Sequence, residues 1–317
     1  KCTIKNERRE KYMTRVDIAI IGSGPAGLEA ALTAKNRNKS IQVFGIKDLS
    51  NKMQVIDHPI TNYLGLSNVT GKQMAEAFTN QMHDAGIEIT ECKVTTVYAM
   101  GDYFALQLSN NEMVEAESVI LASGVVAGKP YSGESEFLGR GVSYCATCDG
   151  AFFRNKVTAV VGGGNVALED ALFLSRMCEK VYLIHRRDEF RGAKILQDEV
   201  KKNDKIEILW NTIVTKIDGD EVVEGLHIQD VDNHVDKLLD VDGIFIAVGT
   251  KPASELLSGK LSTDEKGYII AGEDGVTNIP GIFVAGDGRS KNLRQVVTAV
   301  SDGANCVYSV ERYLQNA

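Results

Sequence analysis

The sequence has no long hydrophobic run, and it has more acidic than basic residues. No stretch reaches the roughly 18 apolar residues of a membrane-spanning helix, and no signal peptide is recognisable. The chain has 35 Lys and Arg against 43 Asp and Glu, which gives a net charge of −8. Because this balance does not offset repulsion from phosphates, neither nucleic-acid nor anionic-membrane partners are expected. The cytoplasm is the default location.

Cysteine is scarce, with six in 317 residues, too few for a secreted disulfide framework in a chain of this length. Two of the six form the motif Cys145-Ala-Thr-Cys148, with Asp149 directly behind it. Two thiols at this spacing can close a small disulfide, and a helix start can lower the pKa of one of them. A purely structural pair or half of a zinc site is the alternative, but no second CxxC supplies further ligands, so no metal is expected. Four cysteines stand alone and are expected to be buried or unreactive: Cys2, Cys92, Cys178 and Cys306.

A glycine fingerprint follows the first predicted strand. An apolar run at 16–21 ends in GSGPAG, and a helical stretch at 28–35 and a second strand at 41–44 come next. In this order of strand, G-x-G-x-x-G and helix, the motif binds the pyrophosphate of a dinucleotide at the helix N-terminus. A glycine-rich turn without a ligand is the alternative. The predicted cofactor contacts are Gly22, Ser23, Gly24, Pro25, Ala26 and Gly27.

A second unit of the same kind begins after the CxxC. A strand at 157–161 leads into GGGNVA, a helix at 168–176 and a strand at 181–184, directly followed by HRRDEFR. An NAD site would hold an acid at this strand tip for the ribose 2′-OH, whereas cations suit a 2′-phosphate and predict NADP(H). A solvated surface charge run is the alternative. The predicted contacts are Gly162, Gly164, Asn165, Val166, Ala167, His185, Arg186, Arg187 and Arg191.

Three further segments are assigned to the frame around these turns. A returning strand closes in Ala122, Ser123 and Gly124, whose backbone is predicted to lie against the nucleotide. A last strand ends in Gly286 and Asp287, ahead of a helix predicted over 293–314. Asp287, with Arg294 and Gln295 at the helix start, is predicted to hold the polar chain and ring edge of a cofactor. Alternatively, Asp287 caps the helix.

The remaining segments predict one helix and several short strands. A helix is expected over 71–85, short antiparallel strands between 87 and 121, and a strand at 243–249 that returns the chain from the second unit. The runs at 206–229 and 235–240 are also interpreted as antiparallel strands. The chain thus contains two similar α/β blocks.

Together these motifs resemble the low-molecular-weight thioredoxin reductases from residue 13 to the C-terminus. The resemblance implies an α/β fold of two Rossmann-like (three-layer ββα) dinucleotide-binding domains, the second inserted in the first. Residues 13–126 and 250–317 would bind FAD, 127–249 would bind NADPH and carry the CxxC, and 1–12 would be a flexible extension. A homodimer is also implied. The motifs that carry the resemblance are GSGPAG at 22–27, CATCDG at 145–150, GGGNVA at 162–167, HRRDEFR at 185–191, AGDGR at 285–289 and RQVVTA at 294–299.

The resemblance further implies an electron path from NADPH through FAD and the disulfide to thioredoxin. Cys148 would be the thiol nearer the flavin, Cys145 the thiol that attacks thioredoxin, and Asp149 the acid/base, although Asp149 as an ordinary helix-capping acid is an alternative. Since the nicotinamide and the CxxC cannot both pack on one flavin face, the family rotates the inserted domain. The connections that would allow this lie near 125–129 and 248–251.

Three residues bear on how closely the chain follows that family. Lys52 stands where the family places a glutamine that faces the flavin, while Asn62 keeps its place, and both are assigned to the cofactor site. This segment is more similar to clostridial ferredoxin-dependent flavin thioredoxin reductases. Val166 replaces a Ser or Thr in the second glycine turn. A ferredoxin-dependent enzyme and a non-catalytic FAD-binding protein are therefore the alternative functions.

Overall fold

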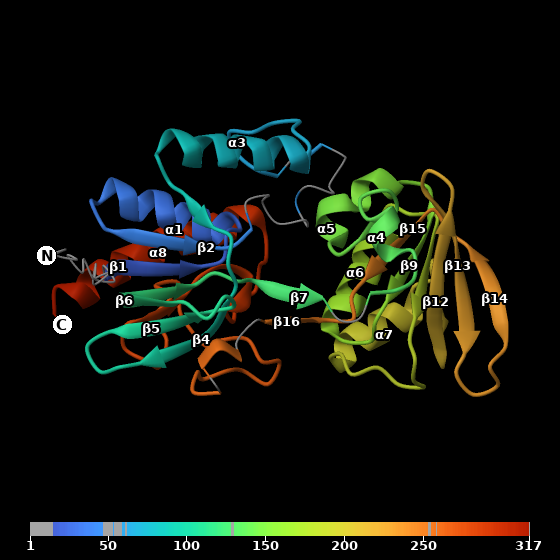
Figure 1. The fold of residues 1–317 in the computed structure, drawn as a ribbon. Helices are drawn as coiled ribbons and strands as arrows, with labels where there is room; N and C mark the ends of the chain where they lie inside the picture. The colour runs from blue at the N-terminus through green and yellow to red at the C-terminus, as the bar shows by residue number, and fades with distance from the viewer. Residues whose placement is uncertain are drawn as a thin grey trace, which may run out of the picture. The chain divides into compact units, whose positions relative to one another are not determined.

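The computed structural model describes residues 15–46, 53, 59–60, 62–127, 130–252, 255–257 and 259–316. The chain divides into two compact units, which Figure 1 follows from blue to red. The first comprises 1–50, 77–125 and 252–317, and the second comprises 51–76 and 126–251. The second unit is therefore inserted in the first. The predicted extension at 1–12 lies outside the described residues, and the nucleotide assigned to each domain stays a prediction.

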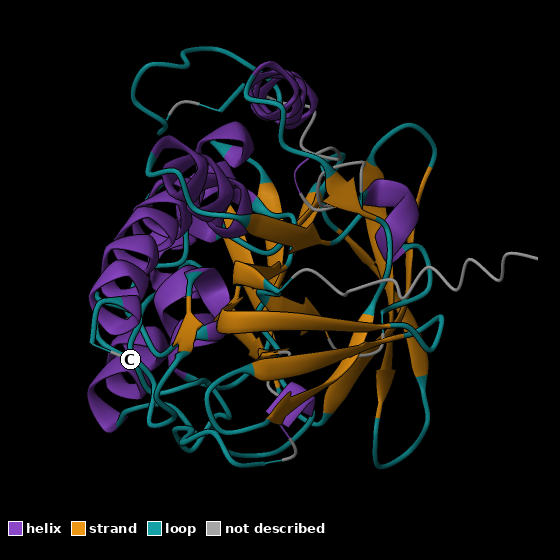
Figure 2. Cartoon of the chain, turned by 60° about the vertical axis from the view of Figure 1, so that its left-hand side comes forward, coloured by secondary structure: helices purple, strands orange, loops and turns teal. Residues whose placement is uncertain are grey.

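The first unit is built on a sheet with both parallel and antiparallel strands. Its strand order is β3-β2-β1-β6-β5-β4, and β17 pairs in parallel with β6. Helices α1 and α8 lie side by side along this unit (Figures 1 and 2). The elements are β1 (Val16–Ile21), α1 (Pro25–Asn36), β2 (Ile41–Phe44), β3 (Ile89–Thr90), β4 (Val94–Ala99), β5 (Phe104–Leu108), β6 (Met113–Leu121), η2 (Glu255–Leu257), β17 (Ile282–Val284), η3 (Gly286–Gly288) and α8 (Val296–Leu314); α3 (Gly71–Asp84) begins in the segment assigned to the second unit and ends in the first.

The second unit combines a parallel sheet with a separate antiparallel one. The parallel strands run in the order β11-β10-β9-β15-β8, and β12, β13 and β14 form the antiparallel sheet. One buried cluster joins the parallel sheet to α6, and another joins its strands to the antiparallel sheet. The elements are α4 (Glu134–Phe137), β8 (Val142–Ser143), α5 (Ala146–Asp149), η1 (Gly150–Phe153), β9 (Val157–Val161), α6 (Asn165–Ser175), β10 (Lys180–Ile184), α7 (Lys194–Lys202), β11 (Ile206–Leu209), β12 (Thr212–Gly219), β13 (Val223–Asp230), β14 (Asp236–Asp240) and β15 (Gly243–Ile246).

These layers explain the composition of the central strands. Because both faces of a parallel sheet in this position are covered, its strands are apolar throughout rather than alternating. In β9, Ala159 and Val160 are fully buried although their side chains point to opposite faces. The predicted α/β class with two dinucleotide-type units is confirmed.

One strand was predicted with the wrong partner, and the helix α7 beside it was not predicted. The segment at 206–209 was expected in an antiparallel pair, but β11 joins β10 in parallel, from Val181↔Ile206 to Ile184↔Leu209. The reason is that α7 carries the chain back between these strands, as a parallel pair requires. Its stretch KILQDEVKK is short and polar, so it lacked a clear signal in the sequence.

The two connections that flank residues 126–251 pair with each other. Strands β7 (Val125–Ala127) and β16 (Thr250–Pro252) form a two-stranded ribbon. The chain therefore leaves the first unit and returns to it along adjacent strands. Among the described residues, no helix combines the length and apolar character needed to cross a membrane.

Candidate active site

The two cysteines of the CxxC motif form a disulfide at the start of a short helix. Cys145 is the N-cap of α5 and is bonded to Cys148. The backbone amides of Cys148 and Asp149 donate to Cys145 O over 3.2 and 3.1 Å and close the turn. Both cysteines are half-buried. The pair thus has the covalent form and the partial exposure that thiol–disulfide exchange requires.

The carboxylate of Asp149 is held by a serine. Asp149 precedes η1 but makes no side-chain capping hydrogen bond there, so the capping alternative is not supported. Instead Ser143 Oγ donates to Asp149 Oδ2 over 2.5 Å. Ser143 Oγ also accepts a hydrogen bond from the Cys145 N–H over 3.0 Å. The acid is thus connected to the first cysteine through one hydroxyl. Its acid/base role stays a prediction.

A second contact holds the residue before Cys145. Tyr144 donates its hydroxyl to Glu134, whose buried carboxylate also accepts the Tyr131 N–H over 2.8 Å. Burial and the neighbouring Glu134 both raise the pKa of Tyr144, so the phenol keeps its proton. The segment that enters the disulfide turn is therefore fixed at two consecutive side chains, Ser143 and Tyr144.

The first glycine turn has the shape that a dinucleotide needs. Gly22 has φ +122°, and a β-carbon there would lie 2.2 Å from Ala122 O; at Gly27 it would lie 1.8 Å from Gly22 O. A β-carbon on Gly24 would meet nothing within 4 Å. The turn is closed on its protein side and open at Gly24, where a diphosphate would approach the N-terminus of α1. These residues fit the predicted group.

The other residues of this turn have mainly structural contacts. The Ser23 hydroxyl donates to Ile46 O over 2.8 Å and accepts the Ile46 N–H over 3.0 Å, which fixes the turn to the end of β2. Pro25 stands in the first turn of α1, and Ala26 is buried. These three residues can therefore contact a ligand through their backbone atoms and through the shape of the turn. Their contact with a cofactor stays a prediction.

Three predicted segments meet at the carboxyl ends of β1, β6 and β17. Ala122 is buried against Gly22, Gly124 is open with φ +63°, and Ser123 is exposed. A β-carbon on Gly286 would lie 2.9 Å from the β-carbon of Ala26. The structure thus brings 122–124 and Gly286 to the first glycine turn. Cofactors in open α/β sheets bind at this edge.

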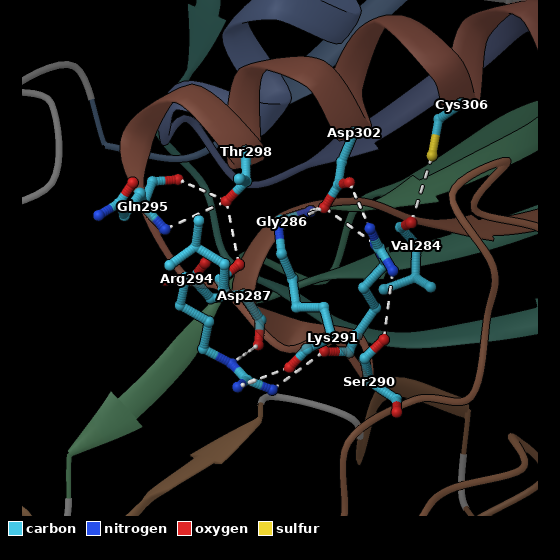
Figure 3. A network of polar contacts seen from close by, with 12 residues as sticks. Val284, Gly286, Asp287, Ser290, Lys291, Arg294, Gln295, Thr298, Asp302 and Cys306 are labelled. Carbon is cyan, nitrogen blue, oxygen red and sulfur yellow. Dashed lines mark hydrogen bonds and ion pairs between the residues drawn. The ribbon is translucent and has the colours of Figure 1, made fainter. Parts of the chain in front are cut away.

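The loop that carries Asp287 is held by an aspartate that was not predicted. Asp302 on α8 accepts the Gly286 N–H over 3.0 Å, two bonds from the Arg289 guanidinium and one from Lys291 Nζ over 2.8 Å (Figure 3). Burial would raise the pKa of Asp302, but the hydrogen bonds from Arg289 and Lys291 outweigh it and lower that pKa. A buried carboxylate therefore organises the whole loop.

Arg294 and Gln295 shape the entry to α8. The Arg294 guanidinium lies over the Tyr268 ring, 4.0 Å from its centroid, and donates to three backbone carbonyls, one of them Asp287 O. Gln295 is the N-cap of α8 and forms a capping box with Thr298 (Figure 3). Asp287 is therefore not the cap of this helix, and the capping alternative is wrong.

The second glycine turn repeats the geometry of the first. A β-carbon on Gly162 would lie 2.5 Å from Ala247 O, whereas one on Gly164 would meet nothing within 4 Å. Asn165 Oδ1 accepts the Ala193 N–H over 2.7 Å, Ala167 is buried and Val166 is 55% exposed. This turn also fits a dinucleotide phosphate at the start of α6, with the apolar Val166 side chain beside it.

The basic residues after β10 divide into one buried ring and three exposed guanidiniums. His185 is buried, and a β-carbon on Gly163 would lie 2.2 Å from its ring. Burial lowers the pKa of His185, so at neutral pH the ring is uncharged. Arg186, Arg187 and Arg191 are exposed, and the Arg191 N–H donates to Gly163 O over 2.8 Å. Positive charge beside the second turn thus comes from the arginines.

The structure also shows what motif reasoning could and could not find. Lys52 lies outside the described residues, and Asn62 is exposed. Asp302 could have been suspected, since it is an acid on the buried face of an otherwise apolar helix stripe. Ser143 and Glu134 have no motif of their own, because only the fold brings them to the disulfide segment.

A disulfide in a turn of one nucleotide-type unit, inserted in a second such unit, defines a dinucleotide-dependent disulfide oxidoreductase. The comparisons agree: the family described as pyridine nucleotide-disulphide oxidoreductase matches residues 16–303, and the chain belongs to it. It is 40% identical to a thioredoxin reductase of Peptoclostridium acidaminophilum over 94% of this chain and 97% of that protein.

Two solved structures extend the comparison. The thioredoxin reductase of Streptococcus pyogenes is 37% identical, covers 96% of this chain and 100% of its own, and has a TM-score of 0.86. A ferredoxin-flavin thioredoxin reductase of Clostridium acetobutylicum is also 37% identical, covers 96% and 99%, and has a TM-score of 0.54. Sequence identity alone does not separate the two types of electron donor.

Proposed function

We propose that this protein is a thioredoxin reductase that uses NADPH as its electron donor and FAD as its bound cofactor. The Cys145–Cys148 disulfide, carried by the unit that holds the second glycine turn, is the observation on which this proposal depends. The relatives at 36–40% identity are thioredoxin reductases over 94% of this chain, which supports the same activity.

The two units divide the binding of cofactors. The first glycine turn, Ala122–Gly124, Gly286–Asp287 and the start of α8 hold FAD, which when bound supplies two-electron chemistry between a nicotinamide and a disulfide. The second turn and the arginines at the tip of β10 hold NADPH. A guanidinium can make two charge-assisted hydrogen bonds to the 2′-phosphate, so the arginines favour NADPH over NADH.

The cysteines then reduce the protein substrate by thiol–disulfide exchange. Cys145 attacks one sulfur of the thioredoxin disulfide, which breaks that bond and forms a mixed disulfide. Cys148, deprotonated by Asp149, attacks Cys145 Sγ and restores the bond within the motif. Thioredoxin, which bound as a disulfide, is released as a dithiol, reduced by two electrons.

Anaerobic mixing tests the donor and the cofactor together. The purified protein should be yellow, and NADPH should bleach the flavin band while NADH at the same concentration does so more slowly. Adding oxidised thioredoxin should restore the yellow colour. Cys145→Ser and Cys148→Ser should each abolish thioredoxin reduction but leave bleaching by NADPH intact. If both variants kept the activity, the protein would instead be an FAD-binding protein with unused cysteines.

A ferredoxin-dependent reductase is the second candidate. The Clostridium acetobutylicum structure, a ferredoxin-flavin thioredoxin reductase at 37% identity, favours it. The exposed arginines beside the second turn favour NADPH. A flavin that stays oxidised with NADPH but is bleached by reduced ferredoxin would reverse the choice.

The assembly and location follow the family. The protein is proposed to be a cytoplasmic homodimer formed through its FAD-binding units. Light scattering on the holoenzyme, expected to give twice the mass of 34.5 kDa, measures the assembly. A monomer would contradict it.

A further inference from the structure

Ser143 is a buried serine at the end of β8, two residues before the CxxC motif, with 4% of its surface exposed. Its hydroxyl accepts the Cys145 N–H over 3.0 Å, and Asp149 Oδ2 lies 2.5 Å away. Cys145 O, the other possible acceptor, is 3.4 Å away. A hydroxyl has one hydrogen to donate, and the shorter contact to a charged oxygen takes it. One side chain thus joins the acid to the first cysteine.

We propose that Ser143 is a positioning residue that holds the Asp149 carboxylate ready to take a proton from the Cys145–Cys148 dithiol. The inference rests on the proposed redox role of this pair. It adds the group that orients the acid. A hydroxyl that donates to the carboxylate stabilises its charged form, which is the form that accepts a proton.

The step in which this matters is the closing of the protein disulfide. The Cys145 thiolate attacks an outside disulfide, whose S–S bond breaks, and the first outside thiolate takes a proton from water. Asp149 takes the proton of the Cys148 thiol. The Cys148 thiolate then attacks Cys145 Sγ, the protein S–S bond forms, and the second outside thiolate leaves with the proton from Asp149. The protein dithiol is oxidised and the outside disulfide is reduced, each by two electrons.

The surroundings of the pair give that proton a route to water. Ser143 and Asp149 belong to the wall of a cavity of about 230 Å³ within the second unit. Arg140, Lys156 and Asp242 are the other charged residues that line it, and Tyr144, which follows the serine in the chain, donates to Glu134 of α4. Since a water occupies about 30 Å³, several fit. Asp149 can therefore exchange its proton at the cavity while Ser143 holds it.

The test follows the protein disulfide itself, without NADPH or thioredoxin. The holoenzyme is reduced with dithiothreitol under argon, desalted and mixed with hydroxyethyl disulfide; remaining thiols are trapped with N-ethylmaleimide, and mass spectrometry of the peptide that contains Cys145 and Cys148 gives the rate of closure. Ser143→Ala should slow closure about 10-fold at neutral pH, part of the 10²–10⁴-fold that a positioned acid/base contributes. The dependence of the closure rate on pH should also differ from that of the wild type, since the carboxylate has lost its donor.

A double-mutant cycle and two further variants decide between positioning and a merely structural role. In an Asp149→Asn background, Ser143→Ala should change the rate less than about 2-fold, because the two residues act as one unit. Ser143→Thr, which keeps the hydroxyl, should retain the wild-type pH profile. Ser175→Ala removes another buried serine of the same unit and should change nothing. The proposal is overturned if Ser143→Ala keeps the wild-type rate and profile, if its effect persists in the Asn background, or if the Thr variant behaves like the Ala variant.

This assay separates the inference from the proposed function. Failure of NADPH to bleach the flavin would contradict the donor, and the closure rates would still measure what Ser143 does. An unchanged closure rate in Ser143→Ala, together with normal NADPH turnover, would contradict the inference alone.

Discussion

Gly24 and Gly27 stand three residues apart in one turn, yet a side chain at each would meet different surroundings. A β-carbon on Gly27 would collide with Gly22 O at 1.8 Å, whereas one on Gly24 has open space. We therefore expect Gly27→Ala to unfold or distort the first unit. Gly24→Ala should melt within a few degrees of the wild type as apoprotein but bind FAD at least 10-fold more weakly, since the methyl group occupies the path of the diphosphate.

Flavin titration and thermal melting of the two apoproteins measure this difference. Gly164→Ala in the second unit is the matched control, because that position is equally open. This variant should bind NADPH more weakly and bind FAD with unchanged affinity. Normal FAD affinity in Gly24→Ala would show that the first turn does not hold a diphosphate.

The exposed arginines after β10 should decide which nicotinamide nucleotide binds. Each contact between a guanidinium and a phosphate is worth about 1.5–3 kcal/mol. Arg186→Ala or Arg187→Ala should therefore lower the affinity for NADPH about 10-fold or more and leave the affinity for NADH unchanged. Trp210 is the single tryptophan, and its ring centroid lies 4.3 Å from that of Phe190. Its fluorescence can therefore report binding.

The control for these substitutions is another exposed arginine of the same unit. Arg176→Ala, at the end of α6, should leave both nucleotides unaffected. Equal loss of NADPH and NADH affinity in the Arg186 and Arg187 variants would mean that the arginines do not recognise the 2′-phosphate.

At the level of elements, the buried carboxylate of Asp302 connects α8 to the loop that carries Asp287. The Arg289 and Lys291 side chains that meet Asp302 are themselves 10% and 5% exposed. Removing one partner of such a buried group leaves the others uncompensated. We expect Asp302→Asn to lower the free energy of unfolding by about 3 kcal/mol and to lower the affinity for FAD.

Glu311→Gln on the same helix is the comparison. Its partner Arg37 has 43% of its side chain exposed, so this ion pair should contribute less than about 1 kcal/mol. Urea unfolding of the two apoproteins gives both values. If the two substitutions cost the same, the Asp302 network would be no stronger than a surface pair.

The pH dependence of that network has a defined sign. The pKa of Asp302 is lowered in the folded protein, so the stability it contributes is present above the unfolded pKa of about 3.9 and is lost as pH falls through the folded pKa. The difference in unfolding free energy between wild type and Asp302→Asn should be constant near neutral pH and shrink below about pH 4. A difference that grew on acidification would contradict the assignment.

The elements that motif and period identify in the sequence are those with local causes. The strands at 16–21, 41–44 and 157–161 occur where apolar β-rich runs predict them, and the first and last of these are each followed by a glycine turn. The pairing of β11 could not be found this way, because it depends on where α7 returns the chain. Ser143 likewise meets Asp149 only because β8 ends beside α5.

At the level of the whole molecule, the proposed chemistry requires movement. FAD is assigned to one unit, while NADPH and the disulfide are assigned to the other, and one flavin face cannot receive both at once. We therefore propose that the inserted unit rotates on the β7–β16 ribbon during each cycle. Raising the viscosity with sucrose should slow NADPH-driven reduction of thioredoxin, since domain motions take microseconds to milliseconds.

Closure of the Cys145–Cys148 bond by hydroxyethyl disulfide provides the control, because it occurs within one unit. Its dependence on viscosity should be no steeper than that of the same reagent with a free thiol peptide. If NADPH turnover were equally insensitive, rotation would not limit the cycle. A cross-link that locks the two units together should stop turnover, and full activity in the locked protein would exclude the rotation.

The adjacent crossing strands also have a consequence for ancestry. Because the chain enters and leaves the segment 126–251 along adjacent strands, this segment can be excised or exchanged at two neighbouring cuts, and the flanking parts can still be joined by a short link. A lineage could in this way replace its source of reducing power while inheriting the rest of the scaffold unaltered. A chimera that receives the corresponding piece of a ferredoxin-type relative would reproduce that history in one construction.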